Sequence, residues 1–230
     1  MQKIKVLLFL LFFGLFFQSF GQKDFYYRVR ADFSVKEKSS DGRNSLTMGK
    51  VYYDKARKRI VYNVLFPEKE MWLFTDSVMY VIKGNNREKK PIVAGYIDFS
   101  VFNLSLNNKL KDYGLKNSIY SLKEVTRDED LVISLWEPHK EYAKLVGNIR
   151  VAVKDNRLFG VLVYDASNKL IGRQVFSEYT KIGSFEFPTE IINITYLENG
   201  EEVTQITTYS NVKVNNWDED YFYNYNVTEP

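Results

Sequence analysis

Few side chains in this chain could take part in catalysis or metal binding. His139 is the only histidine among 230 residues, and there is no cysteine. These counts exclude the common zinc-site spacings and a cysteine–histidine dyad. A serine hydrolase triad would have to use His139, but the nucleophile-elbow pattern Gly-x-Ser-x-Gly does not occur. We therefore interpret His139, which follows Pro138, as a surface loop residue.

Two acidic runs are the other candidates, because neighbouring carboxylates can bind calcium or act as an acid–base pair. They are Asp128-Glu129-Asp130 and Asp218-Glu219-Asp220. Neither has calcium-loop spacing, and both lie at turn or tail positions, so we interpret them as solvated charge. No glycine-rich phosphate loop is present either. The sequence thus predicts no metal, no cofactor and no enzyme. The alternative is an unrecognised hydrolase that uses His139.

Aromatic residues make up 16% of the chain, mostly tyrosine and phenylalanine. Such residues favour pleated sheet and can line apolar cavities. The net charge is only +3, which argues against a nucleic-acid partner because phosphate binding needs a concentrated basic face. Without cysteine there are no disulfides, so stability must come from the apolar core.

The first 21 residues have the pattern of a cleavable secretory signal. Lys3 and Lys5 precede an apolar run from Val6 to Phe17, and small residues follow, with the cut expected after Gly21. This run is short for a bilayer span, which needs about 20 apolar residues. An uncleaved membrane anchor is the alternative. We expect an exported protein whose residues 22–230 form a single, nearly neutral domain.

The exported part alternates between apolar and polar residues with the period of a β-strand. From Phe25 to Val35 every second residue is apolar. We expect four further strands in an antiparallel meander, then a polar loop at Gly84 to Lys90. The strands expected in the meander and after it span residues 46–53, 60–66, 71–75, 78–83, 119–125, 131–136, 148–154, 158–164, 169–179, 187–197 and 202–214, with a possible last strand through Tyr221, Tyr223 and Tyr225.

One segment has helical spacing instead. Between Asp98 and Asp112, apolar residues recur at steps of three and four, and these include Phe102, Leu106 and Leu110. Asp98 is the expected N-cap and Gly114 the expected stop. This predicts a helix inserted after the fifth strand.

These elements predict an α+β fold that is mostly β. About ten or eleven antiparallel strands would form a strongly curved sheet, an incomplete barrel covered by one or two helices, since so large a sheet tends to curl. Its concave apolar face needs a cover, and the space between helix and sheet is a candidate apolar pocket. The alternative is a solid core with nothing inside it.

The stretch from Phe33 to Tyr80 contains in order the Asp41-Gly42 turn, the strand Gly49 to Tyr53, the basic turn Lys55 to Arg59, Pro67 and the segment Trp72 to Asp76. This series resembles the LolA/LolB-like superfamily of periplasmic lipoprotein carriers. The resemblance implies an incomplete antiparallel barrel closed by helices. It also implies a periplasmic location and an apolar interior that holds lipoprotein acyl chains on their way to the outer membrane.

Two departures from that family bear on the cargo. The carriers begin with an amphipathic helix, whereas here the first expected strand follows the cleavage site almost at once. The carriers also have a functional arginine in the basic turn. The nearest position here is Lys55, with Arg57 and Arg59 as neighbours, so the lid-latching role of that arginine is not carried over.

The leading hypothesis is a non-enzymatic periplasmic carrier that binds acyl chains of lipoproteins or other lipids in an apolar cavity. It would exchange them with transfer partners at the inner or outer membrane. The alternative is an envelope scaffold or protein-binding module of the same fold without lipid. Because burial is worth about 0.8 kcal/mol per methylene, the carrier needs an apolar lining, for which we predict Phe33, Val35, Met48, Tyr62, Val64, Trp72, Phe74, Tyr80, Phe102, Leu106 and Leu110.

Overall fold

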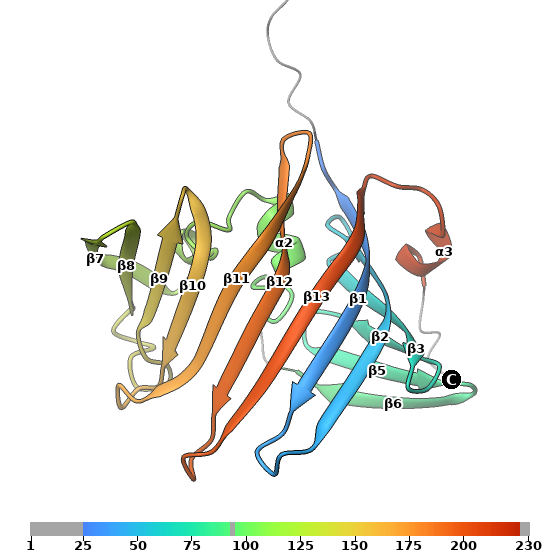
Figure 1. The fold of residues 1–230 in the computed structure, drawn as a ribbon, viewed down its shortest axis with the longest axis horizontal. Coiled ribbons are helices and arrows are strands. Elements are labelled where there is room, and N and C mark those ends of the chain that lie inside the picture. Colours follow the sequence, from blue (N-terminus) through green and yellow to red (C-terminus); the bar gives the residue numbers. More distant parts are fainter. Residues whose placement is uncertain (1–24, 93–94, 226–230) are drawn as a thin grey trace, which may run out of the picture.

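All the strands of the computed structural model belong to one antiparallel sheet (Figure 1). The structure describes residues 25–92 and 95–225, and the expected signal, residues 1–21, lies outside them. Within the described ranges no helix has the length and apolar character needed to cross a membrane. The strands are β1 Arg28–Lys38, β2 Asn44–Asp54, β3 Arg59–Phe66, β4 Glu70–Phe74, β5 Val78–Lys83, β6 Asn86–Pro91, β7 Tyr120–Asp128, β8 Leu131–Pro138, β9 Ile149–Lys154, β10 Arg157–Tyr164, β11 Leu170–Ile182, β12 Phe185–Tyr196 and β13 Glu202–Val214.

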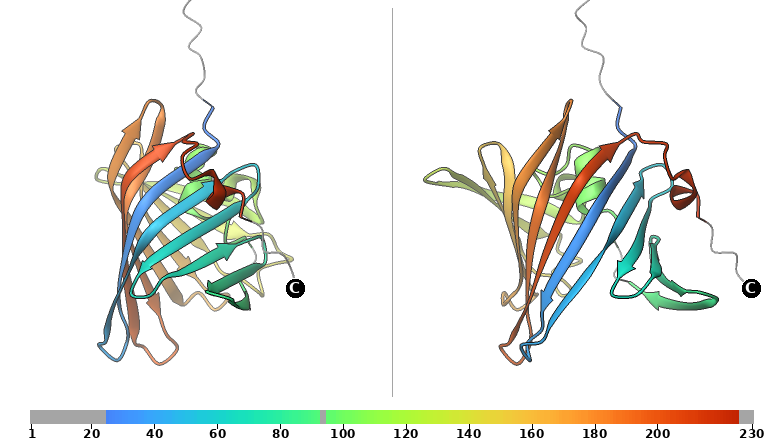
Figure 2. Two further views of the ribbon diagram at one scale, coloured as in Figure 1. Left: turned by 90° about the vertical axis from the view of Figure 1, so that its right-hand side faces the viewer. Right: turned by 45° about the vertical axis from the view of Figure 1, so that its right-hand side comes forward.

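Two meanders meet in the middle of this sheet. The first runs outward from β1 to the edge strand β6, and the second runs inward from the opposite edge strand β7 to β13. β1 and β13 pair with each other, and this pairing joins the two meanders into one sheet of order β6-β5-β4-β3-β2-β1-β13-β12-β11-β10-β9-β8-β7. The sheet is strongly curved and does not close (Figure 2). The predicted fold class is confirmed.

The concave face of the sheet holds the main core. Along β1 the apolar residues Val29, Ala31 and Phe33 are buried on this face, as the alternation predicts. The helix α2, Val101–Leu106, lies on the same side of the sheet (Figures 1 and 2). Its buried Phe102 and Leu104 belong to the same apolar cluster, so α2 covers the concave face.

A second, smaller core lies on the convex face. The short helix α3, Asp220–Tyr223, packs there against β2 and β3. Tyr52, Val61, Leu73 and Tyr223 are buried together in this cluster. β2 to β4 therefore bury apolar side chains on both faces, which explains why the segment from Ile60 to Phe66 is apolar on both faces.

The helix predicted from Asp98 to Asp112 is much shorter in the structure. Only Val101–Leu106 is α-helical, and its N-cap is Ser100, whose Oγ accepts from Asn103 N, rather than Asp98. Asn108 has a positive φ of 53°, and Gly114, at φ 74°, precedes the 3-10 turn η2, Leu115–Asn117. A left-handed residue ends an α-helix. Successive turns nevertheless keep Leu110 against the core, which is why the helical spacing extends beyond the helix.

Three other expectations are corrected. Within the described residues the sheet has thirteen strands rather than ten or eleven. The expected loop Gly84 to Lys90 contains β6, so α2 follows the sixth strand. All six residues of β6 are exposed, and a strand that is solvated on both faces leaves no period-2 apolar signal. The tail with Tyr221 and Tyr223 forms α3 instead of a strand. Residues two apart in a helix point to different sides, so Tyr223 is buried against Tyr52 whereas Tyr221 is 63% exposed.

Candidate functional site

The part of the concave face that lies beneath α2 is filled by aromatic rings. The ring of Phe102 lies 6.1 Å from that of Tyr53, 5.5 Å from Phe187 and 5.4 Å from Tyr209. A hydrogen bond from the Tyr53 hydroxyl to Asn103 Oδ1 (2.8 Å) also ties α2 to β2. The side chains of the protein itself therefore occupy the space directly under the helix.

Farther along the same face, towards β3 and β4, the apolar surface is only partly covered. The Tyr62 ring packs edge-on against Phe33 at 5.0 Å and lies 6.1 Å from Trp72. Tyr62, Trp72 and Val35 are partly exposed, while Phe33 is buried. This part of the concave face, which we call the aromatic shelf and define by Val35, Tyr62 and Trp72, is the surface that could contact hydrocarbon.

The concave face also contains tyrosine hydroxyls whose pKa values burial raises further above neutral pH. Burial raises the pKa of Tyr62 and of Tyr209. Burial likewise raises the pKa of Tyr113 to about 12, although its hydrogen bond to Gln174 Oε1 (2.7 Å) acts in the opposite direction. These groups are polar but uncharged at neutral pH, so they leave the apolar face without a buried charge.

The predicted lining residues divide between the two faces of the sheet. Met48 is 39% exposed and is paired with Ser34, on the face opposite to Phe33. Tyr80 is paired with Leu73 and packs in the convex cluster under α3. The residues that do lie together in the concave cluster are Phe33, Val35, Tyr62, Val64, Trp72, Phe74, Phe102, Leu106 and Leu110.

Sequence reasoning missed several residues that build this face. Tyr53, Phe187 and Tyr209 surround Phe102, yet none was in the predicted lining. Phe187 and Tyr209 come from strands far from β1 in sequence. Only the β1–β13 pairing, which sets Phe33 opposite Tyr209, brings them to the same place. No apolar alternation along β13 indicates Tyr209, because Gln205 and Thr207 alternate with it on the same face.

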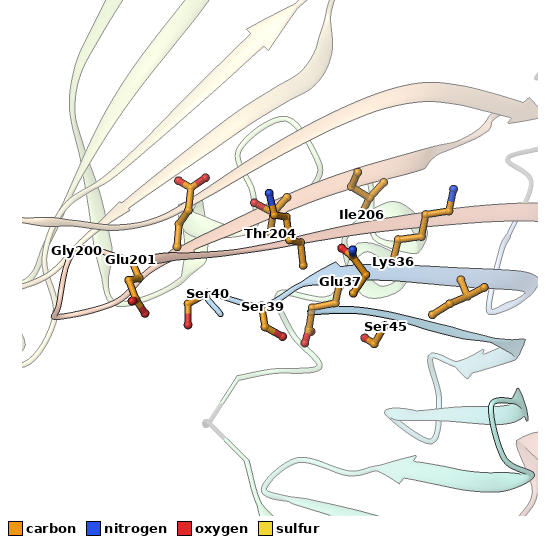
Figure 3. Close-up of a pocket in the computed structure, with 13 residues that line it drawn as sticks. Lys36, Glu37, Ser39, Ser40, Ser45, Gly200, Glu201, Thr204 and Ile206 are labelled. Atoms are coloured by element: carbon orange, nitrogen blue, oxygen red, sulfur yellow. The ribbon is translucent and has the colours of Figure 1, made fainter. Parts of the chain in front are cut away.

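A hollow of about 860 Å³ lies at the lower ends of the hairpins β1–β2 and β12–β13 (Figure 3). Its walls include the charged residues Lys36, Glu37 and Glu201, with Leu46 and Ile206 as the apolar contribution. A wall with this many charges is poorly suited to hydrocarbon, because acyl chains cannot satisfy the hydration of charged groups. The aromatic shelf remains the better candidate for an apolar ligand.

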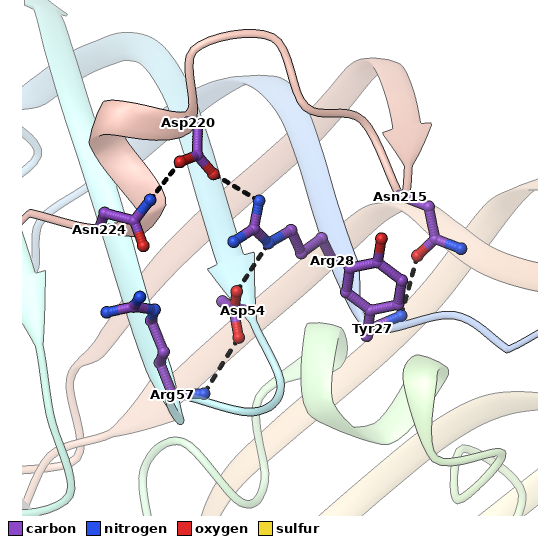
Figure 4. Close-up of polar contacts among 7 residues, drawn as sticks. All are labelled: Tyr27, Arg28, Asp54, Arg57, Asn215, Asp220 and Asn224. Atoms are coloured by element: carbon purple, nitrogen blue, oxygen red, sulfur yellow. Dashed lines mark hydrogen bonds and ion pairs between the residues drawn. The ribbon is translucent and has the colours of Figure 1, made fainter.

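The second acidic run proves to be structural rather than merely solvated. Arg28 is 6% exposed, and its Nε lies 2.7 Å from Asp54 Oδ2 and its Nη1 2.6 Å from Asp220 Oδ1 (Figure 4). The Arg28 guanidinium also lies over the rings of Trp217 and Tyr223, at 4.5 and 4.6 Å. Burial by itself lowers the pKa of Arg28, but its hydrogen bonds to Asp54 and Asp220 outweigh burial and raise it.

Glu219 strengthens the same attachment. Its carboxylate lies 2.7 Å from Arg30 Nε and 2.8 Å from Lys50 Nζ. Burial by itself raises the pKa of Glu219, but the interactions with Lys50 and Arg30 outweigh burial and lower it. These ion pairs hold α3 on the convex face, so the interpretation of residues 218–220 as solvated charge is wrong for Glu219 and Asp220.

The remaining candidates for chemistry are dispersed. His139 is exposed at the turn after β8, and Asp130 in the first acidic run forms an ion pair with Lys154 at 2.5 Å. In the part of the chain that the structure describes, no three histidine, aspartate or glutamate side chains gather where they could hold a metal ion. The described geometry thus assembles an apolar surface and not a set of reactive groups.

Comparison with known proteins identifies the fold. No protein-family model and no curated protein matches the chain. Among the solved structures that are similar to it, three cover most of the chain. A LolA superfamily protein from Nitrosomonas europaea is 14% identical, with a TM-score of 0.58 over 86% of this chain and 90% of that one. A protein described as an outer membrane lipoprotein-sorting domain, from Vibrio parahaemolyticus, is 9% identical, with a TM-score of 0.60 over 87% and 91%.

The third is a DUF1329 family protein from Desulfovibrio piger, 15% identical, with a TM-score of 0.56 over 86% of this chain and 90% of that one. Together these structures confirm the predicted resemblance at the level of the fold, which is LolA-like. At such low identities the likeness extends to the arrangement of the strands and helices and not to individual binding residues.

We predict that Arg28→Ala lowers the free energy of unfolding by about 3 kcal/mol, because it leaves the buried Asp54 carboxylate without its partner. Urea unfolding followed by circular dichroism measures the change. Arg43→Ala is the matched control, since the Arg43 side chain is 83% exposed and pairs only with Asp41 at the surface. The control is expected to change stability by less than about 0.5 kcal/mol. Equal losses in the two variants would contradict the role given to Arg28.

Alkaline pH should destabilise the protein through its buried tyrosines. Because the pKa of Tyr113 is raised to about 12 in the folded state, its contribution is fully present below about pH 10, the usual tyrosine value. As pH rises from there towards 12, the tyrosine loses its proton in the unfolded state but not in the folded state. The free energy of unfolding then falls by up to about 1.4 kcal/mol per pH unit. Tyr113→Phe should make the decline of unfolding free energy above pH 10 less steep. An unchanged slope in urea titrations at pH 10 to 11.5 would exclude Tyr113 as a source.

Proposed function

We propose that this protein is a non-enzymatic carrier that binds the hydrocarbon chains of lipids or acylated lipoproteins against the aromatic shelf. The observation that carries the proposal is the partly exposed apolar surface of Val35, Tyr62 and Trp72 on the concave face. The LolA-like fold supports it, since one of the similar structures is described as a lipoprotein-sorting domain.

The hydrocarbon would lie beside α2 rather than under it. Phe102 already fills the space beneath the helix through its contacts with Tyr53, Phe187 and Tyr209. On the aromatic shelf, each buried methylene contributes about 0.8 kcal/mol. A ligand bound to a partly open surface keeps some of its methylenes in water, which limits the affinity and allows release to a transfer partner.

The place of action follows from the expected signal. A cut after Gly21 would export residues 22–230 as one domain to the periplasm, where an acyl chain crossing to the outer membrane has to be shielded from water. Mass spectrometry of the protein purified from cells that carry the full chain tests this step. We expect a mature protein that starts at Gln22. A purified protein that still contains residues 1–21 would contradict the expected cleavage.

Binding of a fluorescent fatty acid tests the site itself. Val35→Glu places a charge on the aromatic shelf, and we expect it to raise the Kd by about tenfold or more, because a bound chain would then desolvate a carboxylate. Met48→Glu is the matched control, since Met48 lies on the opposite face. The control should bind like the wild type. Equal weakening by both substitutions would contradict a site on the concave face.

A scaffold without lipid is the second candidate. The observation that favours it is that Phe102 and its neighbouring rings fill the space under α2. Lipid extraction and mass spectrometry of the protein purified without detergent separate the two. Co-purified lipid, or saturable uptake of the fatty acid by the wild type, supports the carrier. A wild-type protein that has neither would contradict the carrier and support the scaffold.

A further inference from the structure

The two edges of the sheet differ in a way that the carrier function does not explain. The edge strand β6 carries two adjacent like charges, Lys89 and Lys90, and ends at Pro91, and these features discourage pairing with another strand. The opposite edge strand, β7, instead exposes Leu122 and Val125, at 52% and 55%. Among the described residues only β8 pairs with β7 (Figure 1). An exposed apolar edge is a template for a further strand.

A β-bulge in β7 places these two apolar residues on one face. The pairing with β8 shifts between Leu122 and Glu124, so Leu122 is opposite Trp136 and Val125 is opposite Ser134. Trp136 Nε1 donates to Ser134 Oγ at 2.9 Å, as expected for neighbours on the same face. In a regular strand, residues three apart would point to opposite faces. The bulge thus gathers Leu122 and Val125 on the concave side.

The residues of the bulge itself carry opposite charges on the other face. Lys123 Nζ lies 3.5 Å from Glu137 Oε2, and Glu137 is paired with Ser121 on the convex side. Glu124 is opposite Leu135, which alternates with Ser134 and Trp136 and therefore also faces the convex side. β7 thus presents an adjacent positive and negative charge on one face, flanked by two apolar residues on the other.

We propose that β7 pairs in antiparallel orientation with β7 of a second copy of this chain, about a two-fold axis between Lys123 and Glu124. Such an isologous contact has to be complementary to itself. In this register Lys123 of each copy is opposite Glu124 of the other, and Leu122 of each copy is opposite Val125 of the other. Because of the bulge, the two residues of each such pair lie on the same face of the sheet. A register shifted by one residue would place Lys123 opposite Lys123, or Glu124 opposite Glu124. The charge pattern therefore selects a second copy and one register.

The dimer would leave the aromatic shelf of both copies open. A two-fold axis perpendicular to the sheet keeps the two concave faces on the same side, so the sheets would continue across the contact. β7 lies at the opposite end of the sheet from β3 and β4, which contribute Tyr62 and Trp72. The proposal is consequently independent of whether the concave face binds lipid.

Exchanging the two charges provides the test, with sedimentation equilibrium as the measurement. In the Lys123→Glu variant, a carboxylate at position 123 of each copy is opposite the Glu124 carboxylate of the other copy. In the Glu124→Lys variant, two ammonium groups are opposite each other at the same two contacts. Each single variant should raise the dimer Kd by about tenfold or more, since like charges that are directly opposite destabilise strand pairs. The double variant Lys123→Glu/Glu124→Lys restores opposite charges and should return close to the wild-type Kd.

The design separates the contact from other effects of the substitutions. The single Lys123→Glu and the double variant both lose the internal contact with Glu137, so the difference between them reports on the second copy alone. Lys89→Glu makes the same change on the β6 edge and should leave the Kd unaltered, and circular dichroism checks that each variant is folded. A wild type that stays monomeric at about 100 μM, or a double variant as weak as the singles, would overturn the proposal.

Discussion

The pairing of the first strand with the last is the interaction on which the rest of the structure depends. Neither meander contains the whole core, because β1 to β5 supply Phe33, Tyr53 and Val64, whereas β11 to β13 supply Phe187 and Tyr209. Antiparallel pairing of β1 with β13 sets Phe33 directly opposite Tyr209. Without this pairing, Phe102 of α2 would have rings to contact on one side only.

The alternation of β1 distributes its side chains between two different tasks. Val29, Ala31 and Phe33 enter the concave core, while Arg28 and Arg30, on the other face, bind Asp220 and Glu219 and thereby hold α3. A single strand thus contributes to the core beneath α2 on one face and holds α3 on the other. The two edge strands, β6 and β7, are exposed along most of their length.

The concave face combines a filled region with an open one. Under α2 the rings pack as in an ordinary core, which supplies stability, whereas beside α2 the aromatic shelf leaves Tyr62 and Trp72 partly exposed. A carrier needs both properties, since a face that was apolar and open along its whole length would have little core to stabilise it. The same division means that the open part of the concave face, where we propose that hydrocarbon binds, is shallower than a closed cavity between helix and sheet.

The sequence alone determined the class of fold and most of the strands, because the period-2 alternation of segments such as β1 reflects one buried and one solvated face. Its alternation also indicated that Phe33 of β1 enters the core, and its helical spacing indicated the same for Phe102 of α2. It could not place Met48 and Tyr80, because alternation within a strand does not say which of its two faces is concave. Nor could it indicate that Glu219 and Asp220 pair with arginines about 190 residues earlier. Only the tertiary structure decided these points, because curvature, the coverage of each face and contacts between the two ends of the chain arise from the pairing of β1 with β13 and leave no local pattern.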